Sequence, residues 1–179
     1  MVNNSNNLPI LQRGAPVLAQ VAHTIEDIHS SEIKQLINNL KVTMANASGV
    51  GIAAPQVGVS LRVFLMESAP SERYPNAPLF PLTVLINPII IKTSNQQELG
   101  WEGCLSVKGK RAQVLRHTSI DVNYFDETGK EHHRTLNGFI ARIFQHELDH
   151  LDGITFIERL DHEGDAISEQ QWREQTAES

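Results

Sequence analysis

The sequence predicts an α+β fold with antiparallel sheets, and three observations support this class. Segments rich in β-branched and apolar residues lie in the middle of the chain. Segments with helical periodicity lie on either side of them, near residues 30–49 and 137–153. One pair of candidate strands is separated by a short polar turn, the pattern of a β-hairpin. Strands that are grouped apart from helices favour antiparallel sheets over an alternating parallel architecture.

The first predicted helix begins at Ser30 or Ser31, because a serine hydroxyl is a favourable N-cap. It ends near Gly49, since glycine commonly follows the last turn of a helix. Its apolar residues recur three and four positions apart and therefore share one face: Ile33, Leu36, Ile37, Leu40 and Met44.

Four strands are predicted between the two helices. They cover residues 62–66, 82–91, 120–124 and 132–136. The first two are continuous apolar runs, which is typical of buried strands. In the third, Ile120, Val122 and Tyr124 alternate with polar residues, and residues 126–129 form a turn into the fourth strand.

The second predicted helix runs from Asn137, a favourable N-cap, to Gly153, a favourable stop. Its apolar face predicts that it is buried: Phe139, Ile140, Ile143, Phe144, Leu148 and Leu151. Positions four apart on a helix differ by about 40° around the axis, so His146 and His150 point the same way and can hold one metal ion. Glu147, beside the first of them, can act as a general base on a water molecule.

A catalytic metal site of this kind usually has three protein ligands and one open position. The longer protease signature would place its third ligand where this chain has Phe156. Cys104 is the only cysteine, so it has no partner for an internal disulfide, and its thiolate suits a transition metal. The alternative for a lone cysteine is a small buried apolar residue. Downstream glutamates are the alternative third ligands: Glu158, Glu163, Glu169 and Glu174.

Three motifs resemble those of the peptide deformylases, in the order and at the spacing of that family. They are Gly49–Gln56, Glu102–Ser106 and His146–His150. The resemblance extends from about Leu8 to Leu160, although Lys108 and Leu115 stand where members often have prolines. It implies antiparallel sheets packed around the central HExxH helix. It also implies removal of the formyl group from the N-terminal formyl-methionine of new polypeptides.

The resemblance further implies a role for each motif. The implied metal ligands are Cys104, His146 and His150. They would bind one divalent ion per chain, with Fe²⁺ as the native ion and Zn²⁺, Ni²⁺ or Co²⁺ able to replace it. Glu147 would carry the proton of the attacking water to the leaving amine. The side-chain amide of Gln56 and the backbone N–H of Leu105 would stabilise the oxyanion.

Candidate residues for peptide recognition lie near these motifs. Val50, Phe139 and Ile143 are candidates for an apolar pocket that receives methionine, and ordinary core residues are the alternative for each. Gly51 lies in a glycine-containing segment that a peptide can approach closely and pair with as a strand. Arg111 is a candidate contact further along the peptide, and a solvated surface arginine is the alternative.

The length of 179 residues predicts a single domain over residues 1–179, with a polar tail from about residue 161. The tail contains none of the candidate site residues, so we expect it to be dispensable for chemistry. The net charge of −6 disfavours direct nucleic-acid binding.

No apolar run approaches the length of about 18 residues that a membrane span requires. The first residues also lack the features of a signal peptide. We therefore expect a cytoplasmic protein that acts on a formyl-Met peptide or on a nascent chain at the ribosome. Two alternatives are an HExxH metallopeptidase that uses a downstream glutamate, and a non-catalytic binding module stabilised by a metal.

Overall fold

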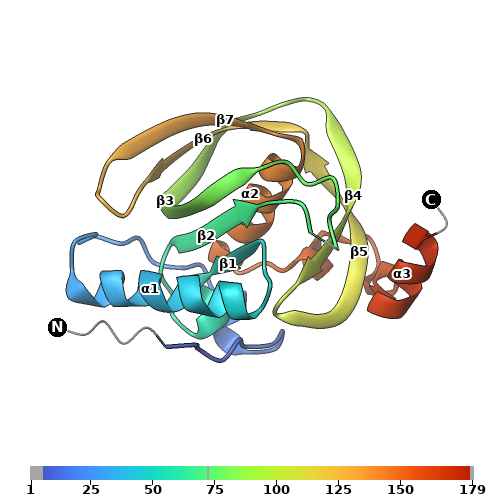
Figure 1. The fold of residues 1–179 in the computed structure, drawn as a ribbon, viewed down its shortest axis with the longest axis horizontal. Coiled ribbons are helices and arrows are strands. Elements are labelled where there is room, and N and C mark those ends of the chain that lie inside the picture. Colours follow the sequence, from blue (N-terminus) through green and yellow to red (C-terminus); the bar gives the residue numbers. More distant parts are fainter. Residues whose placement is uncertain (1–5, 72, 178–179) are drawn as a thin grey trace.

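We describe the protein from a computed structural model, which covers residues 6–71 and 73–177. Figure 1 shows helix α2 in the middle of the molecule, enclosed by strands of two sheets. The helices are α1 (Ser31–Asn46), α2 (Gly138–Leu151) and α3 (Glu169–Ala177). This arrangement confirms the predicted α+β class and the central position of the histidine-bearing helix. Part of the N-terminal segment on which we predicted the absence of a signal peptide, residues 1–5, lies outside the described residues.

The larger sheet has five antiparallel strands in the order β1-β2-β3-β6-β7. They are β1 (Gly51–Ala53), β2 (Val63–Ser68), β3 (Phe80–Thr93), β6 (Ser119–Phe125) and β7 (Glu131–Asn137). The four predicted strands correspond to β2, β3, β6 and β7, and the predicted hairpin is the β6–β7 pair.

The smaller sheet has the order β4-β5-β8. Its strands are β4 (Gln97–Cys104), β5 (Val107–His117) and β8 (Ile167–Ser168). The hairpin formed by β4 and β5 pairs Cys104 with Val107, which places Cys104 at its turn. None of these strands was predicted, because β4 has a single buried residue, Glu102, and the two long strands contain three glycines and many charged residues.

The two faces of the larger sheet carry different helices. In β2, Val63 and Leu65 pack in a core cluster with α1, whereas Phe64 and Met66 pack in another with α2. The rings of Phe64 and Phe144 meet edge to face, with centroids 5.2 Å apart. Each fully buried apolar side chain of this kind contributes about 1.5–3 kcal/mol, so this packing fixes α2 against the sheet.

The ends of the helices follow the predictions in part. The hydroxyl of Ser30 accepts a hydrogen bond from the N–H of Ile33 at 3.3 Å, which confirms the N-cap of α1. Helix α1 ends at Asn46, before Gly49, and Ser48 then adopts a φ of 51°. Asn137 occupies the N-cap position of α2, but its side chain makes no capping hydrogen bond.

The C-terminal segment is more closely packed than a separate tail would be. Ile167 belongs to β8, and Trp172 lies in α3. Strand β8 pairs with β5 through Lys110–Ser168 and Arg111–Ile167, and α3 lies beside β5 (Figure 1). The described part of this segment is therefore joined to the smaller sheet.

Candidate metal centre and substrate cleft

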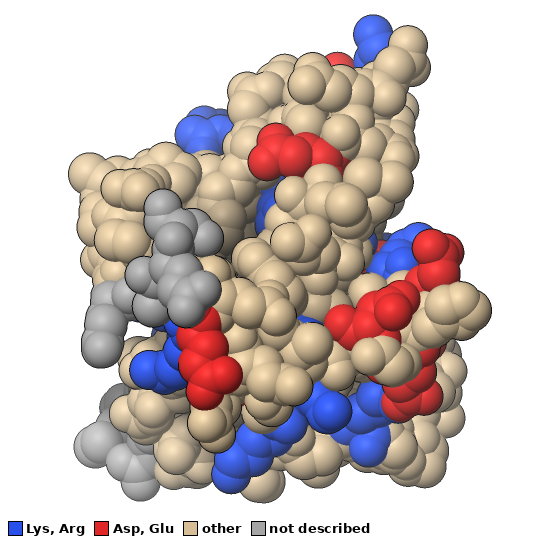
Figure 2. Space-filling view, turned by 90° about the vertical axis from the view of Figure 1, so that its right-hand side faces the viewer, with Lys and Arg blue, Asp and Glu red and all other residues tan. Residues whose placement is uncertain are grey.

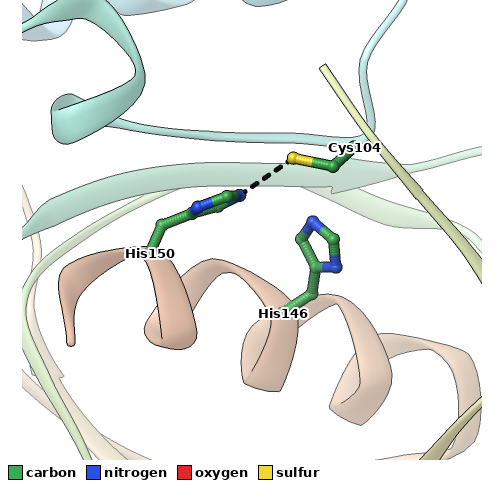
Figure 3. Close-up of side chains that lie close together, drawn as sticks. All are labelled: Cys104, His146 and His150. Carbon is green, nitrogen blue, oxygen red and sulfur yellow. Dashed lines mark hydrogen bonds between the residues drawn. The ribbon is translucent and has the colours of Figure 1, made fainter. Parts of the chain in front are cut away.

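Cys104, His146 and His150 lie together, with one ligand atom from each within 4.8 Å of the others. The histidines project from successive turns of α2 toward the cysteine at the end of β4 (Figure 3). The Sγ atom of Cys104 lies 3.1 Å from Nε2 of His150. One thiolate and two imidazole nitrogens form a donor set suited to a divalent transition metal, so these residues fit the predicted metal centre.

The thiol of Cys104 favours its ionised form. Burial opposes ionisation, but His150 and His146 outweigh burial and lower the pKa of Cys104 to about 5. Two N–H groups also point at the sulfur: the backbone N–H of Ser106 at 3.3 Å and Nε2 of Gln56 at 3.6 Å. The cysteine is therefore prepared to bind a metal as a thiolate.

His146 is held by a buried carboxylate. Its Nδ1 lies 2.8 Å from Oε2 of Glu102, and the same carboxylate receives two hydrogen bonds from Arg116 and one from Arg142. Burial raises the pKa of Glu102, but His146 and Arg116 outweigh it and hold that pKa well below its usual range. An ionised Glu102 requires Nδ1 of His146 to be the donor, which leaves Nε2 free for a metal.

A second carboxylate ties α2 to its surroundings. Asp149 accepts hydrogen bonds from Arg116 and Arg159, each at 2.6 Å. Sequence reasoning missed this network, because β5 contains several other charged residues and nothing in the local sequence sets Arg116 apart from them. Both Arg116 and Asp149 are buried, so removal of either would leave an unpaired charge in the core.

Glu147 lies beside the ligands without joining them. It is buried, and burial raises its pKa to about 7 although His146 and His150 act in the opposite direction. Within the described part of the chain, its Oε2 has no hydrogen-bond partner. A Cβ placed on Gly51 would come within 2.2 Å of Oε1 of Glu147. Gly51 therefore provides the space that the Glu147 carboxylate occupies.

The amide of Gln56 is held on both sides. Its Oε1 accepts from the N–H of Ala53 at 2.8 Å, and its Nε2 donates to the hydroxyl of Ser106 at 3.1 Å. Ser106 is buried, and we did not identify it from the sequence, although it closes the Glu102–Ser106 motif. Leu105, between Cys104 and Ser106, is half-buried and lines the neighbouring cleft.

The metal centre opens into a cleft of about 690 Å³. The residues predicted to contact substrate all line it: Val50, Gly51, Arg111, Phe139 and Ile143. Trp101, Tyr74 and Arg142 also line it and were not predicted. The candidate residues of the expected apolar pocket thus line the same cleft as Cys104 and His146.

Arg142 and Gly100 interlock in the wall of the cleft. The guanidinium donates to the carbonyls of Val114 and Glu98, each at 2.7 Å. A Cβ on Gly100 would come within 2.7 Å of the guanidinium carbon. Any side chain at position 100 would therefore require the guanidinium to move from its observed place.

Arg111 is not the solvated surface arginine that was one of the two alternatives. It is neither solvated nor free, since it is only 4% exposed and its Nε donates to Glu169 at 2.7 Å. Its Nη1 donates to the hydroxyl of Tyr74 at 3.0 Å, and its guanidinium carbon lies 4.5 Å from the centre of the Trp172 ring. Arg111 therefore joins the 69–79 connection and α3 at the cleft, and a direct contact with the peptide stays a prediction.

The C-terminal segment contributes to this cleft. Glu169 and Arg173 of α3 both line it, and the expectation that the tail is dispensable for chemistry stays a prediction. The downstream glutamates considered as third ligands have other partners in the structure. They contact Thr155 and Arg13 (Glu158), Arg13 (Glu163), Arg111 (Glu169) and Gln170 (Glu174). Among the described residues, Cys104 and none of these glutamates lies beside His146 and His150, so the metallopeptidase alternative is not favoured.

Comparison with known proteins decides the family. The family model described as polypeptide deformylase matches residues 7–166. The chain belongs to the polypeptide deformylase family. Peptide deformylase 2 of a Nostoc species is 49% identical over 171 residues, which cover 96% of each chain. Peptide deformylase 2 of Shewanella oneidensis is 49% identical over 152 residues, or 85% of this chain and 83% of that one.

Solved structures of deformylases have the same fold. The Met-Ala-Ser-bound class I type b peptide deformylase of Acinetobacter baumannii superposes with a TM-score of 0.85. It is 42% identical, and the match covers 87% of this chain and 99% of that one. The actinonin-bound peptide deformylase of Ehrlichia chaffeensis is 32% identical, with a TM-score of 0.78, and the match covers 86% and 88% of the two chains.

These relatives confirm the resemblance that the three motifs predicted. As a member of the deformylase family, the chain is a metal-dependent hydrolase, and the non-catalytic alternative is not favoured. In the part of the chain that the structure describes, no helix is long and apolar enough to cross a membrane.

Proposed function

We propose that this deformylase hydrolyses the formyl group of N-terminal formyl-methionine with one divalent metal bound by Cys104, His146 and His150. The observation that carries the assignment is the convergence of these three donors within 4.8 Å, at the end of a cleft that a peptide can enter. A metal bound there lowers the pKa of a water molecule and polarises the formyl carbonyl.

Glu147 is the proposed proton carrier. With its pKa raised to about 7 by burial, its carboxyl group can accept a proton and release it again near neutral pH. Its unpartnered Oε2 is the acceptor that takes the proton of the attacking water. The same oxygen then delivers the proton to the nitrogen of the leaving amine, so that formate and a free N-terminal amine result.

The proposed oxyanion donors are Nε2 of Gln56 and the backbone N–H of Leu105. The orientation of Gln56 supports its role, because Ala53 holds Oε1 and so turns Nε2 toward Cys104. Donors fixed before substrate binds need little reorganisation as negative charge develops on the formyl oxygen.

The proposed methionine pocket is formed by Val50, Phe139 and Ile143, which line the cleft beside the metal centre. Gly51 is proposed to lie against the peptide backbone while it leaves room for Glu147. Arg111 is proposed to act beyond the methionine, where its ties to Tyr74 and Glu169 fix the wall of the cleft.

Family membership favours Fe²⁺ as the working ion, with Zn²⁺, Ni²⁺ or Co²⁺ as substitutes for the same donor set. We propose that the substrate is a formyl-Met peptide or a nascent chain at the ribosome. We also propose that the protein acts in the cytoplasm without direct nucleic-acid or membrane binding.

The test is formate release from formyl-Met-Ala by protein loaded with Fe²⁺ under anaerobic conditions. Wild-type protein is expected to release formate, and Cys104→Ser is expected to lose tight metal binding and activity together. The matched control is Ser60→Ala, because the hydroxyl of Ser60 has no hydrogen-bond partner among the described residues and lies outside the cleft. Absence of formate with metal-loaded, folded wild type would contradict the proposal.

A further inference from the structure

Four exposed cationic residues line the cleft: Arg73, Lys108, Lys110 and Arg173. They come from separate parts of the chain. Arg73 lies in the connection between β2 and β3, the two lysines lie near the start of β5, and Arg173 lies in α3. The fold, and not a local run of sequence, gathers these four residues, which we call the cationic rim.

The charges of the cationic rim are largely unneutralised. Arg73 and the two lysines form no ion pair within 4.0 Å of any residue that the structure describes, although Arg73 is near enough to Glu169 to help Arg111 lower the pKa of that carboxyl. Arg173 lies 3.7 Å from Glu169, which already binds Arg111 at 2.7 Å. The other acidic residues that line the cleft are the buried carboxylates of the metal centre. An anion at the mouth of the cleft would therefore meet cations that lack strong competing partners.

The two lysines project from a fixed backbone. The N–H of Lys108 donates to Oε1 of Gln12 at 3.2 Å, and Lys110 pairs with Ser168 of β8. Between them, Gly109 adopts a φ of 74° and has open space around its Cβ position. The strand edge holds the lysine backbones in place while their side chains extend into solvent.

The sign of the rim is opposite to that of the protein as a whole, whose net charge is −6. On the face that carries β5 and α3, Lys and Arg side chains lie along the lower part of the view, with Asp and Glu side chains at either end of them (Figure 2). A local concentration of one charge beside a cleft raises the concentration of ligands of opposite charge and speeds their association.

We propose that the cationic rim selects formyl-Met peptides that carry acidic residues after the methionine. This inference rests on the proposed function, which places the formyl group at the metal and the methionine in the apolar pocket. The residues that follow are the part of the peptide that leaves the cleft, where the exposed cations lie. Exposed ion pairs are individually weak, so the preference arises from several contacts and from faster association.

The test compares three peptides with amidated C-termini: formyl-Met-Ala-Asp-Glu, formyl-Met-Ala-Asn-Gln and formyl-Met-Ala-Lys-Lys. The second matches the first in shape but lacks its charge. We expect kcat/KM for the acidic peptide to exceed that of its amide counterpart by about three- to tenfold at low salt. The ratio should shrink toward one at high salt, because exposed charges are screened. An equal or reversed order at low salt would overturn the proposal.

Two double variants locate the effect: Lys108→Gln with Lys110→Gln, and Arg73→Gln with Arg173→Gln. We expect the acidic-to-amide ratio to fall toward one in at least one of them. The matched control is Lys34→Gln, which removes an exposed lysine of α1 that does not line the cleft and should leave the ratio unchanged. A ratio that persists in both rim variants would assign the preference elsewhere and overturn the proposal.

Binding of the unformylated peptides separates this inference from the proposed function. Tighter binding of Met-Ala-Asp-Glu than of Met-Ala-Asn-Gln, with no formate release from any formyl peptide, would support the rim and contradict deformylation. Formate release without any preference for acidic peptides would support deformylation and overturn the proposal for the cationic rim. Binding of a short single-stranded RNA that the lysine variant abolishes, together with no peptide preference, would assign the rim to nucleic acid and overturn the proposal.

Discussion

Nδ1 of His146 donates to Oε2 of Glu102 at 2.8 Å, and this bond determines which nitrogen of the imidazole remains for a metal. Because Arg116 and Arg142 hold the same carboxylate, the orientation of His146 depends on a network that reaches both β5 and α2. Metal affinity should therefore respond to residues that never touch the ion.

Glu102→Gln is expected to weaken metal binding by about 10–100-fold, the usual effect of losing a carboxylate behind a ligating histidine. Chelator competition followed by metal analysis measures the affinity. Glu98→Gln, at an exposed glutamate of the same strand, is the control and should retain wild-type affinity. Equal affinities of the two variants would show that the network does not orient His146.

Gly51→Ala is expected to lower kcat by about 10²-fold or more, because the new methyl group would displace the Glu147 carboxylate. Metal content should change little, since the three ligands are not contacted. Steady-state kinetics and metal analysis measure both. Gly164→Ala is the control, because its Cβ position is open and should be tolerated. Normal turnover of Gly51→Ala would mean that Glu147 need not occupy its observed position.

Glu147→Gln should keep the fold and the metal while it lowers the rate by about 10²–10⁴-fold, the range for loss of a general base. Glutamine preserves shape and removes the proton-accepting oxygen pair. Thermal melting, metal content and formate release should be measured on one preparation. A metal-loaded variant with undiminished turnover would remove Glu147 from the mechanism.

The docking of α3 should depend on pH. The hydrogen bond from Arg111 lowers the pKa of Glu169, so the ionised carboxylate stabilises the docked helix. This stabilisation is fully present above the unfolded-state pKa of about 4.3 and is lost as the pH falls through the lower folded pKa. Trp172 fluorescence followed from pH 6 to pH 3 reports the change. Glu169→Gln should remove this dependence, and an unchanged profile in that variant would assign the transition to another group.

We expect the activity of the iron-loaded protein to be sensitive to oxidation. This can be tested by removing the metal and reloading the protein with one kind of ion at a time. Fe²⁺ beside a thiolate ligand and an open position is exposed to peroxide, which oxidises the iron and then Cys104. We expect the iron form to be the most active and to lose activity after peroxide, while the nickel form persists. The measurement is formate release before and after treatment. Equal sensitivity of the two forms would contradict either iron as the working ion or Cys104 as its ligand.

The features that the sequence predicted well are those that local periodicity encodes. The apolar spacing in α2 determines both its helical structure and its buried face, so the relation of His146 to His150 was predictable. Strand β2 was also predictable from the local sequence, because a short continuous apolar run is typical of a buried strand. Its residues contact a helix on each face of the sheet.

The features that were missed depend on contacts between distant segments. In the sequence, Arg111 resembles an ordinary surface arginine. Its partners Glu169 and Trp172 follow it by 58 residues or more, so their contacts with it are not visible in the local sequence. Charged residues of β4 and β5 form ion pairs with residues of α2 and α3: Glu102 pairs with Arg142, and Arg111 pairs with Glu169. No local pattern distinguishes such a paired charge from a solvated one.

Because the guanidinium of Arg142 occupies the space beside Gly100, a substitution at either position should affect the other. A relative that acquires a side chain at position 100 would displace the guanidinium, and a relative that loses the arginine would open a gap beside β4. A guanidinium moved in this way would lose its hydrogen bonds to the carbonyls of Val114 and Glu98, so we expect substitutions at the two sites to appear together across lineages. The position of Arg142 in the cleft wall thus depends on the absence of a side chain at a residue that does not itself line the cleft.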